Sequence, residues 1–270
     1  MGQKLYEENN IQAIANAIRE KNGSIETYKV SEMAAAIAAI ETGGGGGLYD
    51  DAYKQLVTGT LVNFVAPEGT KNIRSSLFYN YTLIQTADLR NTTDMIGSEA
   101  FRGCTALKTV ILPTVMNDKN TPIKSRVFHS CSSLERIETE LEGGFTSATP
   151  AVFQNCTGLK HIDMPNYSFG SSNVCSGCSS LEFVRCKGNL GANAFTGCIN
   201  LKEIVMTSTT GKTNVQSTTF ANTPFSDGSA NLTVYVHNAF IEDYKNDTTW
   251  KIYIDMGSIT LMPIEGSKYE

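Results

Sequence analysis

The chain has 270 residues, of which 41% are apolar and 18% charged, a composition typical of a folded globular protein. Its 22 basic and 27 acidic residues give a net charge of −5, which argues against a nucleic acid partner. The longest strongly apolar run, residues 33–40, is too short to cross a membrane, and residues 1–10 lack the pattern of a secretory signal. We therefore expect a protein made in the cytoplasm, with no membrane insertion and no bound nucleic acid.

Residues 1–42 have the pattern of a small α-helical hairpin. Two groups of apolar residues recur at helical spacing, separated by a helix stop at Asn22-Gly23 and a helix start at Ser31-Glu32. The candidate anchoring residues in these helices are Ile11, Ile14, Ile18, Met33, Ile37 and Ile40. Because such short stripes are marginally stable alone, we expect the hairpin to dock onto another protein or another copy of this chain. Packing onto the rest of the chain is the alternative.

Residues 43–47 are five consecutive glycines. A run without side chains behaves as a flexible linker, so we expect it to separate the hairpin from the rest of the chain. A phosphate-binding loop is disfavoured, because the run lacks both the lysine and the preceding strand of such loops.

Residues 48–236 contain an internal repeat. The frame Phe-x-x-Cys-x-x-Leu-x-x-Ile returns every 20 to 27 residues, a period typical of a solenoid. The first positions of its seven copies are Phe78, Phe101, Phe128, Phe153, Cys175, Phe195 and Phe220. Each copy continues into a short alternating stretch such as residues 107–113, which predicts a half-buried strand. We therefore expect about seven coils with short parallel strands, each coil burying its inner face against its neighbours.

Three of these copies carry a family resemblance. Residues 100–113 (AFRGCTALKTVILP), 152–165 (VFQNCTGLKHIDMP) and 194–206 (AFTGCINLKEIVM) resemble the BspA-type leucine-rich repeats of bacteria and their phages. The resemblance implies a β-rich leucine-rich-repeat solenoid. Residues 237–270, with a short helical stretch through Ile241 and Tyr244 and then Trp250, Tyr253 and Ile264, come after the strand at residues 232–236 and resemble the C-terminal cap of such solenoids. A cap is needed because the last coil would otherwise expose an apolar end and an unpaired strand edge.

The N-terminal segment carries a second resemblance. Residues 11–40 are similar to a module near the N-terminus of tail and other virion proteins of phages that infect Gram-positive bacteria. This resemblance implies a virion protein, anchored through residues 1–42.

The chain has seven cysteines, an odd number that argues against a fully paired disulfide framework. Five of them fill the Cys position of the repeat, namely Cys104, Cys131, Cys156, Cys178 and Cys198. Cys175 takes a Phe position, and Cys186 takes an inward strand position held elsewhere by Leu112, Met164 and Met206. We expect small buried residues with free, slowly reacting thiols. The Cys175-x-x-Cys178 spacing results from the frame, which disfavours a zinc or redox site.

The sequence gives no positive sign of catalysis. The histidines at 129, 161 and 237 fall in separate repeats, and no nucleophile elbow, dinucleotide fingerprint or kinase motif is present. His161 and Asp163 are two residues apart on one predicted strand face and could share a proton, although a solvated pair is favoured. We therefore expect no enzyme activity, no catalytic residues, no cofactor and no metal.

The outward positions of the strands form columns. The first column alternates in sign and predicts structural ion pairs between coils: Lys108, Glu135, Lys160, Glu182 and Lys202. The next columns obey no such rule, and they supply the candidate binding surface: Ile111, Arg136, His161, Asp163, Phe183, Arg185 and Val205. An exposed Phe183 beside Ile111 and Val205 would make an apolar patch for recognition.

Together these patterns predict a non-enzymatic structural or binding protein of a phage virion. Residues 1–42 would bind other virion proteins, and the solenoid would be displayed toward a host-surface protein or glycan, in several copies or as a homo-oligomer. A bacterial cell-surface adhesin with leucine-rich repeats is one alternative. A solenoid that serves only as a structural scaffold of the particle is another.

Overall fold

The computed structural model describes residues 56, 59–113, 116–117, 122–139 and 149–270. The chain divides into two compact units, Met1–Leu61 and Val62–Glu270. The predicted hairpin, with Ile11, Ile14, Ile18, Met33, Ile37 and Ile40, and the glycine linker at residues 43–47 lie outside the described residues. The labelled strands and helices all belong to the second unit.

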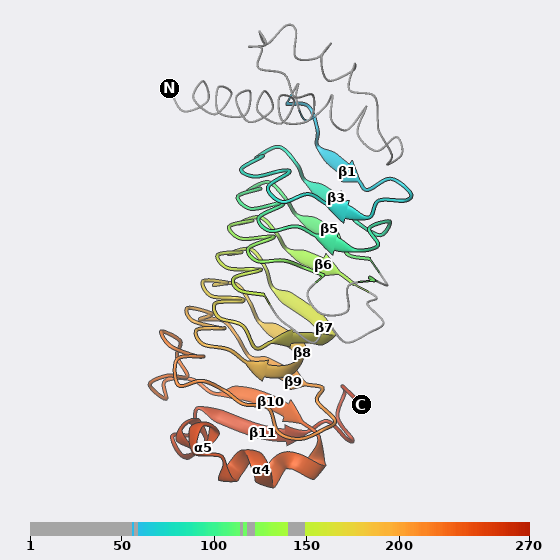
Figure 1. Ribbon diagram of the computed structural model, residues 1–270. Helices are drawn as coiled ribbons and strands as arrows, with labels where there is room; N and C mark the ends of the chain where they lie inside the picture. The colour runs from blue at the N-terminus through green and yellow to red at the C-terminus, as the bar shows by residue number, and fades with distance from the viewer. Residues whose placement is uncertain (1–55, 57–58, 114–115, 118–121, 140–148) are drawn as a thin grey trace, which may run out of the picture. The chain divides into compact units, whose positions relative to one another are not determined.

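The described residues of this unit form a sheet of nine parallel strands, one above the other (Figure 1). In spatial order they are β1 (Asn63–Val65), β3 (Thr86–Asp88), β5 (Thr109–Ile111), β6 (Arg136–Glu138), β7 (His161–Phe169), β8 (Phe183–Leu190), β9 (Glu203–Met206), β10 (Leu232–Val236) and β11 (Ile259–Pro263). A smaller parallel pair, β2 (Asn72–Ile73) and β4 (Met95–Ile96), lies in the first coils. The predicted leucine-rich-repeat solenoid of short parallel strands is confirmed. Its first strand, β1, precedes the first aligned copy of the frame, and β11 adds a strand from the cap.

The register of the sheet matches the repeat frame. Val110 pairs with Ile137, and Val184 pairs with Ile204, so the frame's Ile position forms an inward column, and these four residues are buried. Because neighbouring strands align the same frame position, the outward positions also stand in columns.

Phenylalanines stack in a second inward column. Phe78 to Phe101, Phe101 to Phe128 and Phe128 to Phe153 have ring centroids 4.9, 5.6 and 5.9 Å apart with near-parallel planes. Cys175 interrupts this column. Phe169, at the end of β7, stacks on Phe195 at 6.0 Å, and Phe195 stacks on Phe220 at 5.9 Å, so a ring from outside the frame lies next to the gap.

The turn around each phenylalanine uses left-handed backbone conformations. The residue two positions after the Phe position has positive φ in all seven copies: Asn80, Gly103, Ser130, Asn155, Gly177, Gly197 and Asn222. Six of these residues are glycine or asparagine, the types that tolerate this conformation best, and the seventh is Ser130. In six copies the residue two positions before the Phe position has positive φ as well, including Glu99 and Arg126. The turn geometry therefore overrides residue preference at that position.

The repeated cysteines join adjacent coils. The thiols of Cys104, Cys131, Cys156 and Cys178 each donate to the carbonyl oxygen at the Phe position of the preceding coil at 3.0 Å, and Cys198 donates to the Cys175 carbonyl at 3.1 Å. All seven cysteines are buried and free, as the alignment predicts. The alignment does not predict that five of them are also hydrogen-bond donors.

The cap closes the last coil with helices and one strand. A 3-10 turn, η1 (Asn238–Phe240), leads into α4 (Ile241–Asn246) and α5 (Thr248–Asp255), and β11 pairs with β10 over five residues. Asp247 caps α5 by accepting from the backbone N–H groups of Thr249 and Trp250. The buried Trp250 indole donates to the Thr213 carbonyl at 2.8 Å. These contacts cover the apolar end of the solenoid, as predicted.

Candidate functional site

The candidate binding residues lie on one side of the sheet, opposite the buried core. Register pairs Arg136 with His161 and His161 with Phe183, and in the next column it pairs Asp163 with Arg185 and Arg185 with Val205. Ile111 lies on β5, three strands from Phe183, and is half-buried. Six of the seven residues therefore occupy adjacent strands, β6 to β9, and we call this side of β5 to β10 the outer sheet face.

Two members of the predicted charge column, Glu182 and Lys202, form an ion pair between adjacent coils. The Lys202 ammonium lies 2.6 Å from a carboxylate oxygen of Glu182 on the neighbouring coil. The hydrogen bond from Lys202 holds the pKa of the Glu182 carboxyl below its ordinary value. Both side chains are well solvated, so this pair contributes to register more than to stability.

Phe183 lies within an aromatic cluster. The His161 ring lies 6.0 Å from the Phe183 ring, and the Tyr269 ring stacks on Phe183 with centroids 5.5 Å apart and planes at 27°. Tyr235 on β10 meets the same Tyr269 edge to face at 4.8 Å. Tyr269 therefore lies between rings supplied by β8 and β10.

Arg185 binds the same segment. One guanidinium nitrogen donates to the Tyr269 carbonyl oxygen at 3.1 Å, and the guanidinium carbon lies 5.8 Å from the centre of the Tyr269 ring. A second nitrogen lies 3.5 Å from the Asp163 carboxylate on β7. Asp163 thus pairs with Arg185 across the strands, whereas the sequence suggested His161 as its neighbour.

Glu203 binds two side chains of this segment. Its carboxylate accepts a hydrogen bond from the Tyr269 hydroxyl, and it forms an ion pair with the Lys268 ammonium at 3.1 Å. The Tyr269 hydrogen bond, reinforced by Lys268, holds the pKa of the Glu203 carboxyl below its ordinary value. Burial and the contact with Glu203 raise the pKa of the Tyr269 hydroxyl. At neutral pH the site therefore holds an ionised Glu203 and a protonated Tyr269.

Residues 267–270, which we call the strap, turn back on themselves as they cross the face. The Ser267 hydroxyl donates to the Ile264 carbonyl at 2.6 Å and accepts from the Tyr269 N–H at 3.1 Å. The Glu270 carboxylate accepts from the Gly266 N–H at 2.8 Å. These local bonds preorganise the strap so that Lys268 and Tyr269 both reach Glu203.

The strap corrects two expectations about the apolar patch. Strand alternation predicts an exposed Val205, yet its relative exposure is 0%. Its register neighbours Arg185 and Tyr235 both contact Tyr269, so the strap spans the position of Val205. Phe183 is half-buried under the same ring. The role of these residues in binding stays a prediction.

Sequence reasoning missed four members of this site. The candidate residues named from the sequence do not include Glu203, Tyr235, Lys268 or Tyr269. The one available signal was register, since Tyr235 is the outward residue that comes after Val205 in its column.

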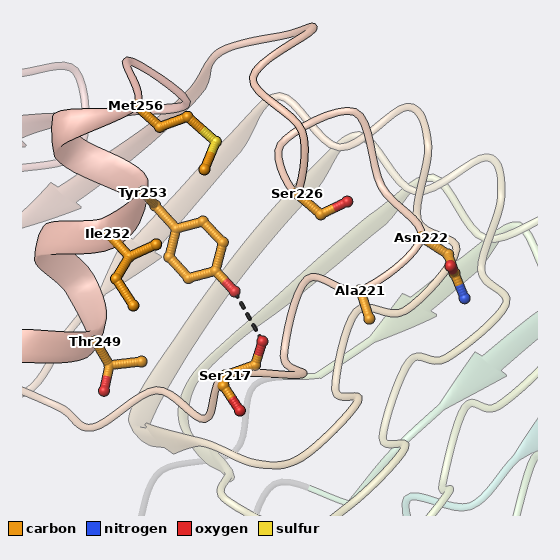
Figure 2. Close-up of a pocket in the computed structure, with 8 residues that line it drawn as sticks. All are labelled: Ser217, Ala221, Asn222, Ser226, Thr249, Ile252, Tyr253 and Met256. Atoms are coloured by element: carbon orange, nitrogen blue, oxygen red, sulfur yellow. Dashed lines mark hydrogen bonds between the residues drawn. The ribbon is translucent and has the colours of Figure 1, made fainter.

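A hollow of about 330 Å³ lies between the last coil and the cap helix α5 (Figure 2). Its lining consists of Ser217, Ala221, Asn222, Ser226, Thr249, Ile252, Tyr253 and Met256. The Tyr253 side chain points from α5 toward Ser217, and its hydroxyl donates to the Ser217 carbonyl at 3.0 Å. None of these side chains carries a charge, so the hollow offers less chemistry than the outer sheet face.

Two further properties of the described part of the chain bear on function. Among the residues that the structure describes, no group of three or more His, Cys, Asp or Glu side chains is arranged to hold a metal ion. Within the same ranges, no helix combines the length and apolar character that crossing a membrane requires.

Two solved structures match this chain. The chain is similar to a leucine-rich repeat protein of T. pallidum, with 24% identity, a TM-score of 0.46, and coverage of 57% of this chain and 73% of that one. It is also similar to a leucine-rich cell surface protein of Faecalibacterium prausnitzii A2-165, with 14% identity, a TM-score of 0.23, and coverage of 76% and 88%. No curated protein gives a significant match.

The family model described as BspA type leucine-rich repeat region matches six copies over residues 52–138, 71–191, 114–227 and 171–245. These ranges together span 52–245, which includes the strands from β1 to β10. The chain therefore belongs to the BspA type leucine-rich repeat family.

Proposed function

We propose that this protein is a non-enzymatic binding protein whose solenoid recognises another protein through the outer sheet face. One observation carries the proposal: the face already binds a peptide segment, because Phe183, Arg185 and Glu203 hold Lys268 and Tyr269 by stacking, a carbonyl contact and an ion pair. Solenoids commonly use such extended faces for recognition. The part of the face toward β6 and β7 presents exposed Arg136, His161 and Asp163 beyond the strap.

The setting that we propose is a phage virion. The support is the resemblance of residues 11–40 to a virion module, together with the glycine run at residues 43–47. In this setting residues 1–42 bind other virion proteins, and the solenoid contacts a host-surface protein or glycan. A bacterial cell-surface adhesin is the alternative, since the repeat family alone is compatible with either setting.

Antibody labelling tests the setting. Antibody raised against residues 62–270 should label intact, purified phage particles from the source. Label on bacterial envelopes with none on particles would overturn the virion setting and favour the adhesin.

A binding measurement tests the outer sheet face. The double variant Arg136→Glu, His161→Ala of the full chain should bind the labelled particle or cell surface at least tenfold more weakly than the unaltered chain. Lys251→Glu is the matched control, because it makes the same charge change at an exposed position of α5. Equal loss in both variants would contradict a role for the outer sheet face.

A further inference from the structure

We infer that the strap occupies a recognition site for a basic residue followed by an aromatic residue in a partner protein, and that such a partner binds by displacing it. This inference rests on the proposed function, because it names the partner chemistry of the same face. Lys268 and Tyr269 show which groups the sheet can hold there.

The sheet supplies an aromatic slot. Phe183 on β8 offers a ring face at 5.5 Å and Tyr235 on β10 meets the bound ring edge to face at 4.8 Å. The two rings come from strands separated by β9, on which the buried Val205 stands in register between Arg185 and Tyr235, the position of an apolar floor for the slot. A slot with a stacking wall, an edge-on wall and an apolar floor selects a flat ring.

The polar groups beside the slot determine which chemical groups a bound partner can place next to the ring. Glu203 accepts from a phenolic hydroxyl and pairs with an ammonium group on the preceding residue. Arg185 donates to the main-chain carbonyl of the aromatic residue, a contact that recognises polypeptide. The Lys268 ammonium also lies 4.9 Å from the centre of the Tyr269 ring, so the cation and the ring bind to the slot as one unit. The best occupant is a Lys-Tyr or Arg-Tyr pair within a peptide chain.

The strap is held in a way that permits displacement. The backbone hydrogen bonds found for residues 267–270 in the described part of the chain stay within the segment from Ile264 to Glu270. Its contacts with the sheet are made by side chains and by the Arg185 bond to one carbonyl. The residues of β11, by contrast, are bound to β10 by a parallel ladder of five residue pairs. The strap can therefore leave without disturbing the sheet.

The site also continues beyond the strap. The exposed His161 lies against Phe183 at 6.0 Å, and the exposed Asp163 pairs with Arg185. A partner longer than the strap would meet these groups on β7 after its aromatic residue fills the slot. The strap thus covers one part of a larger binding face.

The test uses the full chain with Tyr269→Ala, which empties the slot. The probe is the peptide Gly-Ser-Lys-Tyr-Glu, which matches residues 266–270, and the control peptide has Ala in place of Tyr. A tethered segment works at an effective concentration on the order of millimolar, so a mostly bound strap implies a peptide Kd of about 1 mM or lower. In an NMR titration we expect saturable binding to Tyr269→Ala, binding at least tenfold weaker to the unaltered chain, and none of the control peptide.

A second variant makes the result specific. Adding Glu203→Gln to Tyr269→Ala should weaken peptide binding at least fivefold, because the ion pair with the basic residue is lost. Lys268→Ala keeps the ring but loosens the strap, so it should bind the peptide with intermediate affinity and serves if Tyr269→Ala does not fold. Absence of binding to both variants with native circular dichroism, or equal binding to variant and unaltered chain, would overturn the inference.

The outcome is separable from that of the proposed function. If the peptide fails to bind while surface binding still depends on Arg136 and His161, the strap is a fixed part of the fold and the proposed function stands. If the peptide binds while surface binding is unaffected by the double variant, the slot exists and the proposed route to the partner is wrong.

Discussion

The thiol of Cys131 lies 3.0 Å from the carbonyl oxygen of Phe101, one coil earlier in the solenoid. The same oxygen accepts the backbone N–H of Cys104 at 3.1 Å, so it receives two hydrogen bonds, one from its own coil and one from the next. The repeated cysteine is therefore both a small apolar filler and a donor that satisfies a buried carbonyl.

Removing this thiol should lower the free energy of unfolding by more than the loss of side-chain volume alone would. Cys131→Ala loses the bond to the Phe101 carbonyl and leaves a small void, which we expect to lower the free energy of unfolding by about 1 to 3 kcal/mol. Cys186→Ala is the matched control, because its equally buried thiol contacts the Met206 sulfur at 4.0 Å and, among the described residues, donates to no carbonyl. Urea unfolding should show the larger loss for Cys131→Ala. Equal losses would mean that the thiol hydrogen bond adds nothing.

The buried thiols predict that the protein becomes less stable in alkali. Burial raises the pKa of six of them above the ordinary value: Cys104, Cys131, Cys156, Cys175, Cys186 and Cys198. Below about pH 8.5 the thiols are protonated in both folded and unfolded chains. Above it the unfolded chain loses protons that the folded chain retains, so stability falls by about 1.4 kcal/mol per pH unit for each thiol.

Unfolding measured between pH 8 and pH 10 checks this slope. Cys186→Ala should reduce the slope of the free energy of unfolding against pH by the contribution of one thiol, about 1.4 kcal/mol per pH unit, whatever it does to the stability at pH 8. A pH-independent free energy of unfolding over this range would contradict the burial of the thiols.

Thiol labelling gives a kinetic counterpart. Since all seven thiols are buried, a thiol reagent at pH 8 should label the folded protein only as fast as the coils open, and should label all seven in denaturant. Rapid labelling of most of them in the folded protein would contradict both the repeat alignment and the structure.

The solenoid could be predicted from sequence because its period, inward columns and cysteine position all repeat. Each repetition is an independent sign of the same geometry, so a departure such as Cys175 in a Phe position does not hide the frame. The left-handed turn residue could also have been found, since Asn80, Gly103 and Asn155 stand two positions after their Phe position.

The strap could not be predicted in the same way. Its contacts join Tyr269 to Phe183 and Glu203, which are far from it in sequence. Because these contacts occur only once, no periodic pattern in the sequence reveals them. The exposure of Val205 is mispredicted for the same reason: strand alternation assigns an outward side chain, but it does not say which segment returns to cover that side.

Gly191 should be intolerant of any side chain. A Cβ built at this position would lie 2.2 Å from the Ser171 carbonyl oxygen, a backbone atom, so two chain segments would have to separate. We expect Gly191→Ala to lower the free energy of unfolding by about 1 to 3 kcal/mol. Gly170→Ala is the control in the same region, because its nearest neighbour is the Ser168 hydroxyl at 3.3 Å, a side-chain atom that can shift more easily than a backbone carbonyl, at the cost of its hydrogen bond from the Gly170 N–H. A similar loss for both would contradict the close approach at Gly191.

The cap depends on a buried tyrosine. The Tyr244 hydroxyl accepts from the Thr213 N–H at 2.9 Å and lies 3.0 Å from the Thr213 hydroxyl. Tyr244→Phe leaves that N–H buried without this partner, and we expect a loss of about 1 to 3 kcal/mol. Tyr253→Phe, which loses one bond at the edge of the hollow beside α5, should cost less. Fluorescence of Trp250, the single tryptophan, reports the unfolding of both variants, and a larger loss in Tyr253→Phe would contradict the arrangement.

The hydrogen bonds of the repeated cysteines have nearly constant length, although the number of residues between donor and acceptor varies. The donor and acceptor are separated by 26, 30, 28, 25 and 23 residues along the chain, yet the distances stay at 3.0 to 3.1 Å. Each coil therefore keeps one geometry at this bond while the length of its chain varies elsewhere. Insertions or deletions on the side away from these bonds can lengthen or shorten a loop without shifting the rows of the outer sheet face, so loops and binding residues can diversify independently.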